Sequence, residues 1–226
     1  MIIGFLIAIL SFSPHILAGE KLDRFLMGSV VKSEEWEIDR KKNIEYFKKN
    51  VYFKNYYYTM KSDYAVYDRN KQTWDVKGGV YCKKKFDDGS WIEMYCDRGV
   101  YLEKDEKANL FSDNRVKMVY FDFIKKEFYV SYSKKALADN NYKKIFFKGD
   151  FEVKISSLTA YSEEAVYDDM EKTFILNSKP SAFGFNEKYK VYIQSEKIKL
   201  NKTELSVSAE KNVFGVLKPF KNKDKK

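Results

Sequence analysis

Histidine, cysteine and proline are nearly absent from this chain of 226 residues. It has one His, at position 15, two Cys and three Pro. A single His so close to the start excludes His-based acid–base catalysis, Ser-His-Asp triads and zinc sites that need His. Two Cys cannot form a structural zinc site alone. The small numbers of Pro and Gly argue against a disordered or linker-rich protein.

Motifs of catalytic and phosphate chemistry are missing as well. Gly78-Gly79 is a strand break with no helical pattern after it, so there is no Gly-rich phosphate loop. No stretch carries a sustained helical period with caps, although a short, weak helix near residues 34–46 is one interpretation. Four Asp residues stand at expected turns: Asp68, Asp139, Asp168 and Asp169. We expect them to accept hydrogen bonds within the turns rather than to act as paired catalytic acids. We therefore expect no catalytic residue, no metal site, no cofactor and no enzyme activity.

Aromatic residues and lysine are what the chain has in abundance. Aromatics make up 17% of the residues, and the formal net charge is +9. The ring surface can build an extended core or line an apolar cavity. Lys is spread along the whole chain, which is typical of solvated strand faces and protected sheet edges. Attraction to anionic lipid headgroups is the alternative, and nucleic acid is not an expected partner.

The first residues predict export. Met1–Leu10 is an uncharged apolar run, and a small residue, Ala18, precedes a polar stretch. This pattern predicts a secretory signal over residues 1–18, with an uncleaved membrane anchor as the alternative. Residues 19–35 form an N-terminal segment, residues 36–218 one domain, and residues 219–226 a basic disordered tail. In an oxidising compartment Cys82 and Cys96, which flank an Asp-Asp-Gly turn, are placed for a cross-strand disulfide; two buried thiols are the alternative.

One short phrase recurs five times. Its copies begin 34, 37, 29 and 33 residues apart and read Ser62–Asp68, Cys96–Leu102, Ser133–Asp139, Ser162–Asp168 and Ser195–Asn201. Such a recurrence predicts one supersecondary unit repeated along the chain, and the phrase itself is rich in strand formers. A polar turn follows each copy. Before a later strand there is a break, at Gly78-Gly79, Asn114-Arg115, Gly149-Asp150 and Lys211-Asn212, with Pro180-Ser181 in the divergent fourth unit.

Alternation of apolar and polar residues predicts one dry and one wet face for each strand. If the chain kinks at Asp63-Tyr64, the dry face holds Met60, Tyr67, Trp74, Val76, Val80, Ile92, Met94 and Tyr101. The fold class is therefore all-β and antiparallel, either a sandwich, a jelly roll or an open barrel.

The repeated grammar resembles the OstA-like family of lipopolysaccharide-transport proteins, which includes the periplasmic bridge protein LptA and the inner-membrane protein LptC. The residues that carry the likeness are Ser62-Asp63, Tyr67-Asp68 and Gly78-Gly79-Val80, with Asn50-Val51 as a remnant of an earlier element. The likeness runs from about Trp36 to Leu217. The fourth unit departs from the pattern, and the chain is rich in Lys and Tyr.

The resemblance implies an open β-jelly roll whose interior holds the acyl chains of a lipid. The eight dry-face residues are then candidates for the groove lining, with a filled core as the alternative for each. The implied function is a periplasmic bridge for lipopolysaccharide or another glycolipid. The implied partners are other jelly-roll proteins, or copies of this chain, that pair through strand edges. The alternatives are an anchored LptC-like protein and an envelope scaffold that binds no lipid.

Overall fold

The computed structural model describes residues 29–185, 188–204 and 206–219. The predicted signal, residues 1–18, and nearly all of the predicted tail lie outside this part of the chain. Every element in it is a strand, and none of its residues belongs to a helix that could cross a membrane. The strands are β1 (Val30–Lys32), β2 (Glu35–Asp39), β3 (Ile44–Lys54), β4 (Tyr58–Asp68), β5 (Thr73–Lys85), β6 (Trp91–Leu102), β7 (Lys107–Asp122), β8 (Glu127–Asp139), β9 (Lys144–Ile155), β10 (Leu158–Asp168), β11 (Thr173–Asn177), β12 (Ser181–Phe185), β13 (Tyr189–Gln194), β14 (Lys197–Asn201), β15 (Ser206–Glu210) and β16 (Phe214–Pro219).

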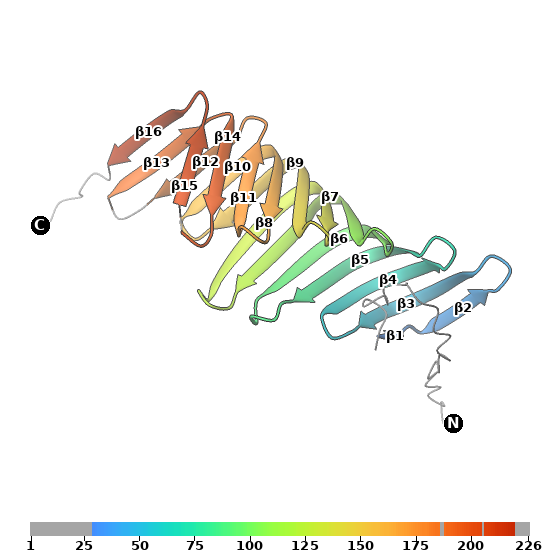
Figure 1. Cartoon of the computed structure of the whole chain (residues 1–226). Coiled ribbons are helices and arrows are strands. Elements are labelled where there is room, and N and C mark those ends of the chain that lie inside the picture. The colour runs from blue at the N-terminus through green and yellow to red at the C-terminus, as the bar shows by residue number, and fades with distance from the viewer. Residues whose placement is uncertain (1–28, 186–187, 205, 220–226) are drawn as a thin grey trace, which may run out of the picture.

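All strands belong to one antiparallel sheet in which chain neighbours pair from β3 to β11. Beyond β10 the sheet continues along two paths, β11-β14-β15 and β12-β13-β16. At the other end β1 and β2 both pair with β3, on different halves of that strand. Figure 1 shows the result as an elongated sheet with β1 to β3 at one end and β13, β15 and β16 at the other.

The long strands bend halfway, which folds the sheet into two layers. From β3 to β10 each pairing shifts register near the middle of the strands, for example between Lys61 and Tyr64 and between Tyr95 and Arg98. We call this line of bulges the corner. The first layer holds β2, β11, β14, β15 and the strand halves that pair with them in register. The second layer holds β1, β12, β13, β16 and the other halves. This is the open β-jelly roll that the resemblance implied, and one of the three architectures that the alternation pattern allowed.

The repeated phrase is the corner itself. The buried hydroxyl of Ser62 donates to the carbonyl of Tyr64, and Ser133, Ser162 and Ser195 each donate to the carbonyl two residues on, at 2.8–2.9 Å. A side chain that bonds its own backbone in this way draws the chain out of the straight ladder. The kink predicted at Asp63-Tyr64 is thus present in each of these copies.

The corner is also crossed between copies of the phrase, and most of these intervening bends have residues with left-handed backbone conformation. Consecutive residues with positive φ stand at Lys49-Asn50, Gly78-Gly79, Gly149-Asp150, Ser178-Lys179 and Lys211-Asn212. The divergent fourth unit therefore keeps the bend, two residues earlier than the predicted Pro180-Ser181. At Asn114-Arg115 the register shifts without left-handed residues.

A sixth copy of the phrase, Ser33–Asp39, lies within residues 30–54 and was missed in the sequence. The hydroxyl of Ser33 donates to the carbonyl of Glu35 at 2.8 Å, as in the other copies. Strands β2 and β3 pair here from Asp39↔Ile44 to Glu35↔Lys48. The short helix considered for residues 34–46 is wrong, because Trp36 and Ile38 alternate with charged residues as in a strand. The sheet also begins at Val30, before the expected boundary at residue 36.

Turns at the free edge of the first layer, which we call the lip, follow one pattern. As predicted, Asp68, Asp139 and Asp168 each accept two backbone N–H bonds in the turn that follows, and Asp39 and Asn201 do the same. Asp169 does not cap a turn; it accepts from the side chains of Tyr167 and Lys172.

Candidate functional site

The eight predicted lining residues all belong to the apolar interior between the layers. Tyr67, Trp74, Val76, Val80, Ile92 and Met94 are buried, while Met60 and Tyr101 are partly buried and pack against the same core. Rings of opposite layers meet in this interior: the centroids of Phe53 and Trp74 are 6.2 Å apart, and those of Tyr120 and Tyr167 are 6.0 Å apart. The two layers therefore face each other across one core.

A cavity of about 170 Å³ interrupts this core. Of the eight predicted residues, Met60, Ile92, Met94 and Tyr101 line it. Tyr67 does not, and the lining residues of the later repeats include Tyr167 and Asp169. Tyr67, Trp74, Val76 and Val80 belong instead to the filled core. The apolar lining residues that were missed include Phe53, Phe86, Leu110 and Ile145. Leu110 and Ile145 follow the same alternation of apolar and polar residues in β7 and β9. Applying that alternation to the strands after Tyr101 could therefore have found them.

Toward β1 and β2 the interior is filled by stacked rings. The centroids of Trp36 and Phe47 are 6.0 Å apart, those of Phe47 and Trp74 5.7 Å, and those of Tyr67 and Trp74 4.6 Å. Glu103 is buried beside this stack and accepts from Trp74 Nε1 at 2.8 Å and from Tyr67 Oη at 3.0 Å. The stack therefore has a polar end that faces the lip.

In each of the five copies predicted from the sequence, one polar residue lies along the lip, directly after the phrase. These eighth residues, which we call the lip row, are Arg69, Glu103, Asn140, Asp169 and Lys202. The backbone N–H of each donates to a carbonyl of the preceding turn at 2.9–3.0 Å. Because the backbone is fixed in the same way each time, the side chains of the lip row are what differs from one repeat to the next.

Asn140 ties the lip to the second layer at the mouth of the cavity. Its Nδ2 donates to Tyr58 Oη at 2.9 Å, and Lys84 Nζ donates to its Oδ1 at 2.8 Å. All three residues line the cavity. The closure at this point is therefore made by side-chain hydrogen bonds and not by the sheet ladder.

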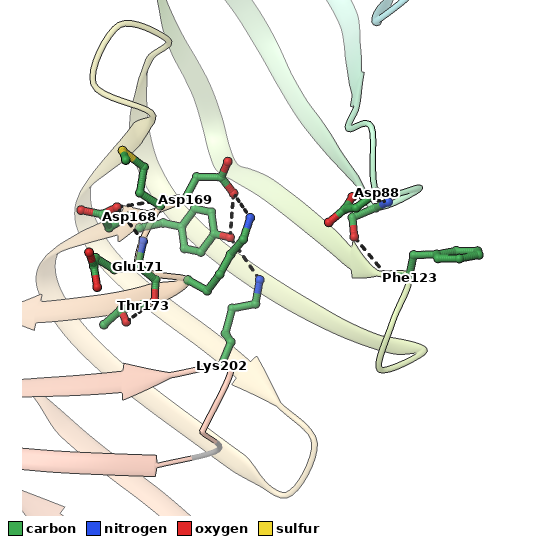
Figure 2. Close-up of polar contacts among 11 residues, drawn as sticks. Asp88, Phe123, Asp168, Asp169, Glu171, Thr173 and Lys202 are labelled. Carbon is green, nitrogen blue, oxygen red and sulfur yellow. Dashed lines mark hydrogen bonds and ion pairs between the residues drawn. The ribbon is translucent and has the colours of Figure 1, made fainter.

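Lys202 makes a second closure, deeper in the interior. Its side chain is only 2% exposed and reaches from the turn between β14 and β15 toward the neighbourhood of Asp169 (Figure 2). Lys202 Nζ lies 3.2 Å from the ring centroid of Tyr120 and 4.6 Å from that of Tyr129, both in the second layer. It also donates to Tyr167 Oη at 3.1 Å. These three rings form a tyrosine cage around one ammonium group.

Burial changes the protonation of this region. Burial, with the charge of Lys172 as a second cause, lowers the pKa of Lys202 to about 7. Burial also acts to lower the pKa of Lys172, but the hydrogen bond and charge of Asp169 raise it overall. The pKa of Tyr167 is raised, chiefly by burial, so its hydroxyl stays neutral. Lys125 reinforces the closure, since its Nζ donates to the carbonyls of Lys202 and Thr203.

The predicted disulfide is not formed, because Cys82 and Cys96 are free thiols. Cys82 pairs with Met94, and Cys96 pairs with Val80, so the two are diagonal neighbours two positions apart. Diagonal positions in a ladder are too distant for a bond of ordinary geometry. Burial raises the pKa of both thiols to about 12, which makes them poor nucleophiles.

A larger hollow of about 470 Å³ lies near the corner between β9 and β10. Its lining includes Arg115, Asp150, Glu152, Glu163 and Lys179. This charged lining does not suit acyl chains, so the smaller apolar cavity is the candidate site.

Fold and site define an all-β protein whose single repeat-built sheet bends into two layers around an apolar interior. No protein-family model matches the chain, and no curated protein matches it in sequence. Among solved structures it is similar to LptH from Pseudomonas aeruginosa, described as the LptA homologous periplasmic component of the conserved lipopolysaccharide transport device. The two share 9% identity with a TM-score of 0.36, over 84% of this chain and 95% of that one. The likeness is distant.

Proposed function

We propose that this chain is an exported, non-enzymatic bridge protein that carries lipopolysaccharide or a similar glycolipid between membranes. The observation that carries the proposal is the apolar cavity between the layers. Met60, Ile92 and Met94 face it from the second layer, and Tyr101, Leu110 and Ile145 face it from the first. Flexible Met and aliphatic side chains adapt well to acyl chains, and each methylene they bury contributes roughly 0.8 kcal/mol.

The cavity is small, and we interpret it as the closed state of such a groove. Pockets for small ligands usually enclose roughly 300–1,000 Å³, whereas this one encloses about 170 Å³. A lipid with several chains requires the layers to separate. At the mouth they are joined by the contacts of Asn140 with Tyr58 and Lys84. Hydrogen bonds of this kind contribute about 1 kcal/mol each, so opening at this point is inexpensive.

Both ends of the folded sheet offer edges for association. Within the part of the chain that the structure describes, β1 and β2 pair only with β3, β15 only with β14, and β16 only with β13. Unpaired strand edges are templates for pairing with another chain. We expect other jelly-roll proteins of the envelope, or copies of this chain, to add to these edges and lengthen the groove.

The proposal places the mature chain in the periplasm after cleavage behind Ala18. N-terminal sequencing of the exported protein tests this. An intact Met1 in the membrane fraction would favour the anchored, LptC-like alternative.

Site-specific photo-crosslinking tests the lipid site. A photoreactive amino acid at Met94, which lines the cavity, is expected to capture glycolipid in a lipopolysaccharide-producing host. The matched control is Tyr95, the next residue of β6, which is 38% exposed on the opposite face. Equal capture at both positions, or none at either, would contradict the groove.

One observation favours a second candidate, an envelope scaffold that binds no lipid. Beyond the cavity the interior of the β11–β14 region is filled, with Phe174, Leu176 and Ile198 at 0% exposure. In that case capture would occur only at positions on the edge strands, to protein and not to lipid.

A further inference from the structure

Lys202 stands at the boundary between two different parts of the interior. Tyr167, which accepts its hydrogen bond, also lines the apolar cavity. Past Lys202 the interior is occupied by fully buried apolar side chains of the last strands, among them Phe174, Leu176 and Leu200. The ammonium of Lys202 lies among rings of both layers and bonds the cavity-lining Tyr167.

A cation is an unfavourable way to fill such a space. Removing an ammonium from water costs several kcal/mol unless it is paired, and an apolar side chain of similar volume packs there without that cost. Within the described residues, Lys202 Nζ makes one hydrogen bond, to a neutral hydroxyl, besides its contacts with the tyrosine rings. A residue that lowers stability at a buried position indicates a functional role more than a structural one.

The attachment of Lys202 allows it to leave the cage without unfolding the sheet. Its side chain is held by one hydrogen bond and by ring contacts, and its carbonyl by Lys125 from the turn between β7 and β8 in the second layer. The backbone N–H of Lys202 bonds within its own layer, to Lys172. Rotation of the side chain into solvent therefore breaks contacts between the layers and none of the ladder bonds.

We propose that Lys202 is a gate residue that closes the interior past Tyr167, and that it must leave the tyrosine cage before an acyl chain can extend from the cavity toward the C-terminal strands. This inference rests on the proposed lipid-binding function and adds to it the residue that limits how much of the groove is open. The other members of the lip row hold the same place in their repeats. Asn140 is the corresponding, more accessible closure at the cavity mouth.

Chain-length dependence of binding tests the gate. Single-chain fatty acids from octanoate to palmitate are titrated against the full chain by displacement of an apolar fluorescent probe. While added methylenes are buried, affinity rises about fourfold for each one. For the native protein we expect the rise to stop once the cavity is filled. For Lys202→Ala we expect it to continue to longer chains.

Matched variants separate the gate from a general effect. Lys202→Met keeps the space filled, so its affinity should stop rising at the same fatty-acid length as that of the native protein. Lys104→Ala should behave in the same way, because Lys104 is exposed in another turn of the same lip. If Lys202→Ala stops at the native length, the gate is overturned. If Lys202→Ala does not fold, Lys202→Gln, with a shorter side chain, replaces it under the same criterion.

Failure of the proposed function would give a different result. If no fatty acid binds to any variant, the lipid site is contradicted. The gate is then tested by the access of a small reagent to the interior beyond Lys202. For this, Leu176→Cys is introduced with both native Cys replaced by Ser, and its alkylation by a small neutral maleimide is timed. Alkylation that is at least tenfold faster with Lys202→Ala than with Lys202 supports the gate, and equal rates overturn it.

Discussion

Asp63 lies directly over Gly78 at the corner. A β-carbon on residue 78 would stand 2.8 Å from Asp63 Cβ and 2.9 Å from Asp63 Cγ, closer than real side chains approach. Gly78 also has a φ of +78°, which residues with a β-carbon rarely adopt. The second residue of the repeated phrase thus occupies the space that glycine leaves free in the next strand.

Replacing Gly78 by Ala should therefore destabilise the fold more than replacing its neighbour. Gly79 also has a positive φ, +52°, but a β-carbon there meets nothing within 4 Å. We expect Gly79→Ala to lower the free energy of unfolding by about 1 kcal/mol from backbone strain alone. For Gly78→Ala we expect about 1–3 kcal/mol more, from overpacking. Urea unfolding of both variants measures the difference, and equal losses would show that Asp63 moves aside.

The stability of Lys202→Met should depend on pH differently from that of the native protein. The pKa of Lys202 is lowered from 10.5 to about 7 by burial, so the unfolded chain keeps this proton to higher pH than the folded one. Between these values folding releases a proton, and the contribution of Lys202 to the free energy of unfolding rises with pH by up to about 1.4 kcal/mol per unit. Below pH 7 this dependence ends.

Urea unfolding of Lys202→Met from about pH 7 to about pH 10 measures this effect. We expect the variant to be more stable than the native protein at pH 7 and the advantage to shrink as pH rises. Lys104→Met is the control and should show no such trend. A constant difference would mean that other groups facing Lys202 hold its charge, namely Tyr120, Tyr129, Tyr167, Asp169, Lys172, Asp122 and Lys125.

Glu103 is expected to be important for the stability of the aromatic stack. It is buried and accepts from Trp74 Nε1 and Tyr67 Oη. Replacement by Leu leaves two buried donors without this acceptor, at about 1–3 kcal/mol each. Glu103→Gln keeps one acceptor oxygen and should lose about half as much. Denaturant unfolding followed by Trp fluorescence measures both variants. A free energy of unfolding of Glu103→Leu equal to that of the native protein would mean that water replaces the carboxylate.

Cys96 should tolerate replacement by Ser. It occupies the phrase position at which Ser62, Ser133, Ser162 and Ser195 bond the carbonyl two residues on. A serine hydroxyl can make the same bond, so we expect a change in stability within about 1 kcal/mol. Mass spectrometry after alkylation in urea without reductant should show two modified thiols in the native protein. One or none would reveal a disulfide after all.

The corner was predictable because its chemistry is local. A serine bonds the carbonyl two residues ahead, and glycine or asparagine takes a positive φ at most of the intervening bends. The bends at Asn114-Arg115 and Ser178-Lys179 depart from this pattern. The copy Ser33–Asp39 was missed because Glu35, Glu37 and the lysines after it suggested a helix, although Ser and Asp keep the usual spacing of six residues.

The site was less predictable because it depends on contacts between distant repeats. The alternation of apolar and polar residues correctly placed Met60, Ile92, Met94 and Tyr101 on the inner face. Whether an inward side chain lines a cavity or packs against a neighbour depends on the opposite layer, which the local sequence does not describe. Nothing local distinguishes Lys202 from the lysines at other turns. Its burial follows from Tyr120 and Tyr129, which are 82 and 73 residues away in the chain, and from the angle at which the two layers meet.

The corner also makes the length of the molecule adjustable. One repeat of this chain adds two adjacent strands, each of which crosses the corner and so enters both layers together. Neighbouring strands lie about 4.8 Å apart, so gain or loss of one repeat changes the interior by about 10 Å without a new junction or a change of edge. Tandem duplication or deletion of one repeat, with no accompanying point mutation, is therefore enough to lengthen or shorten the folded sheet.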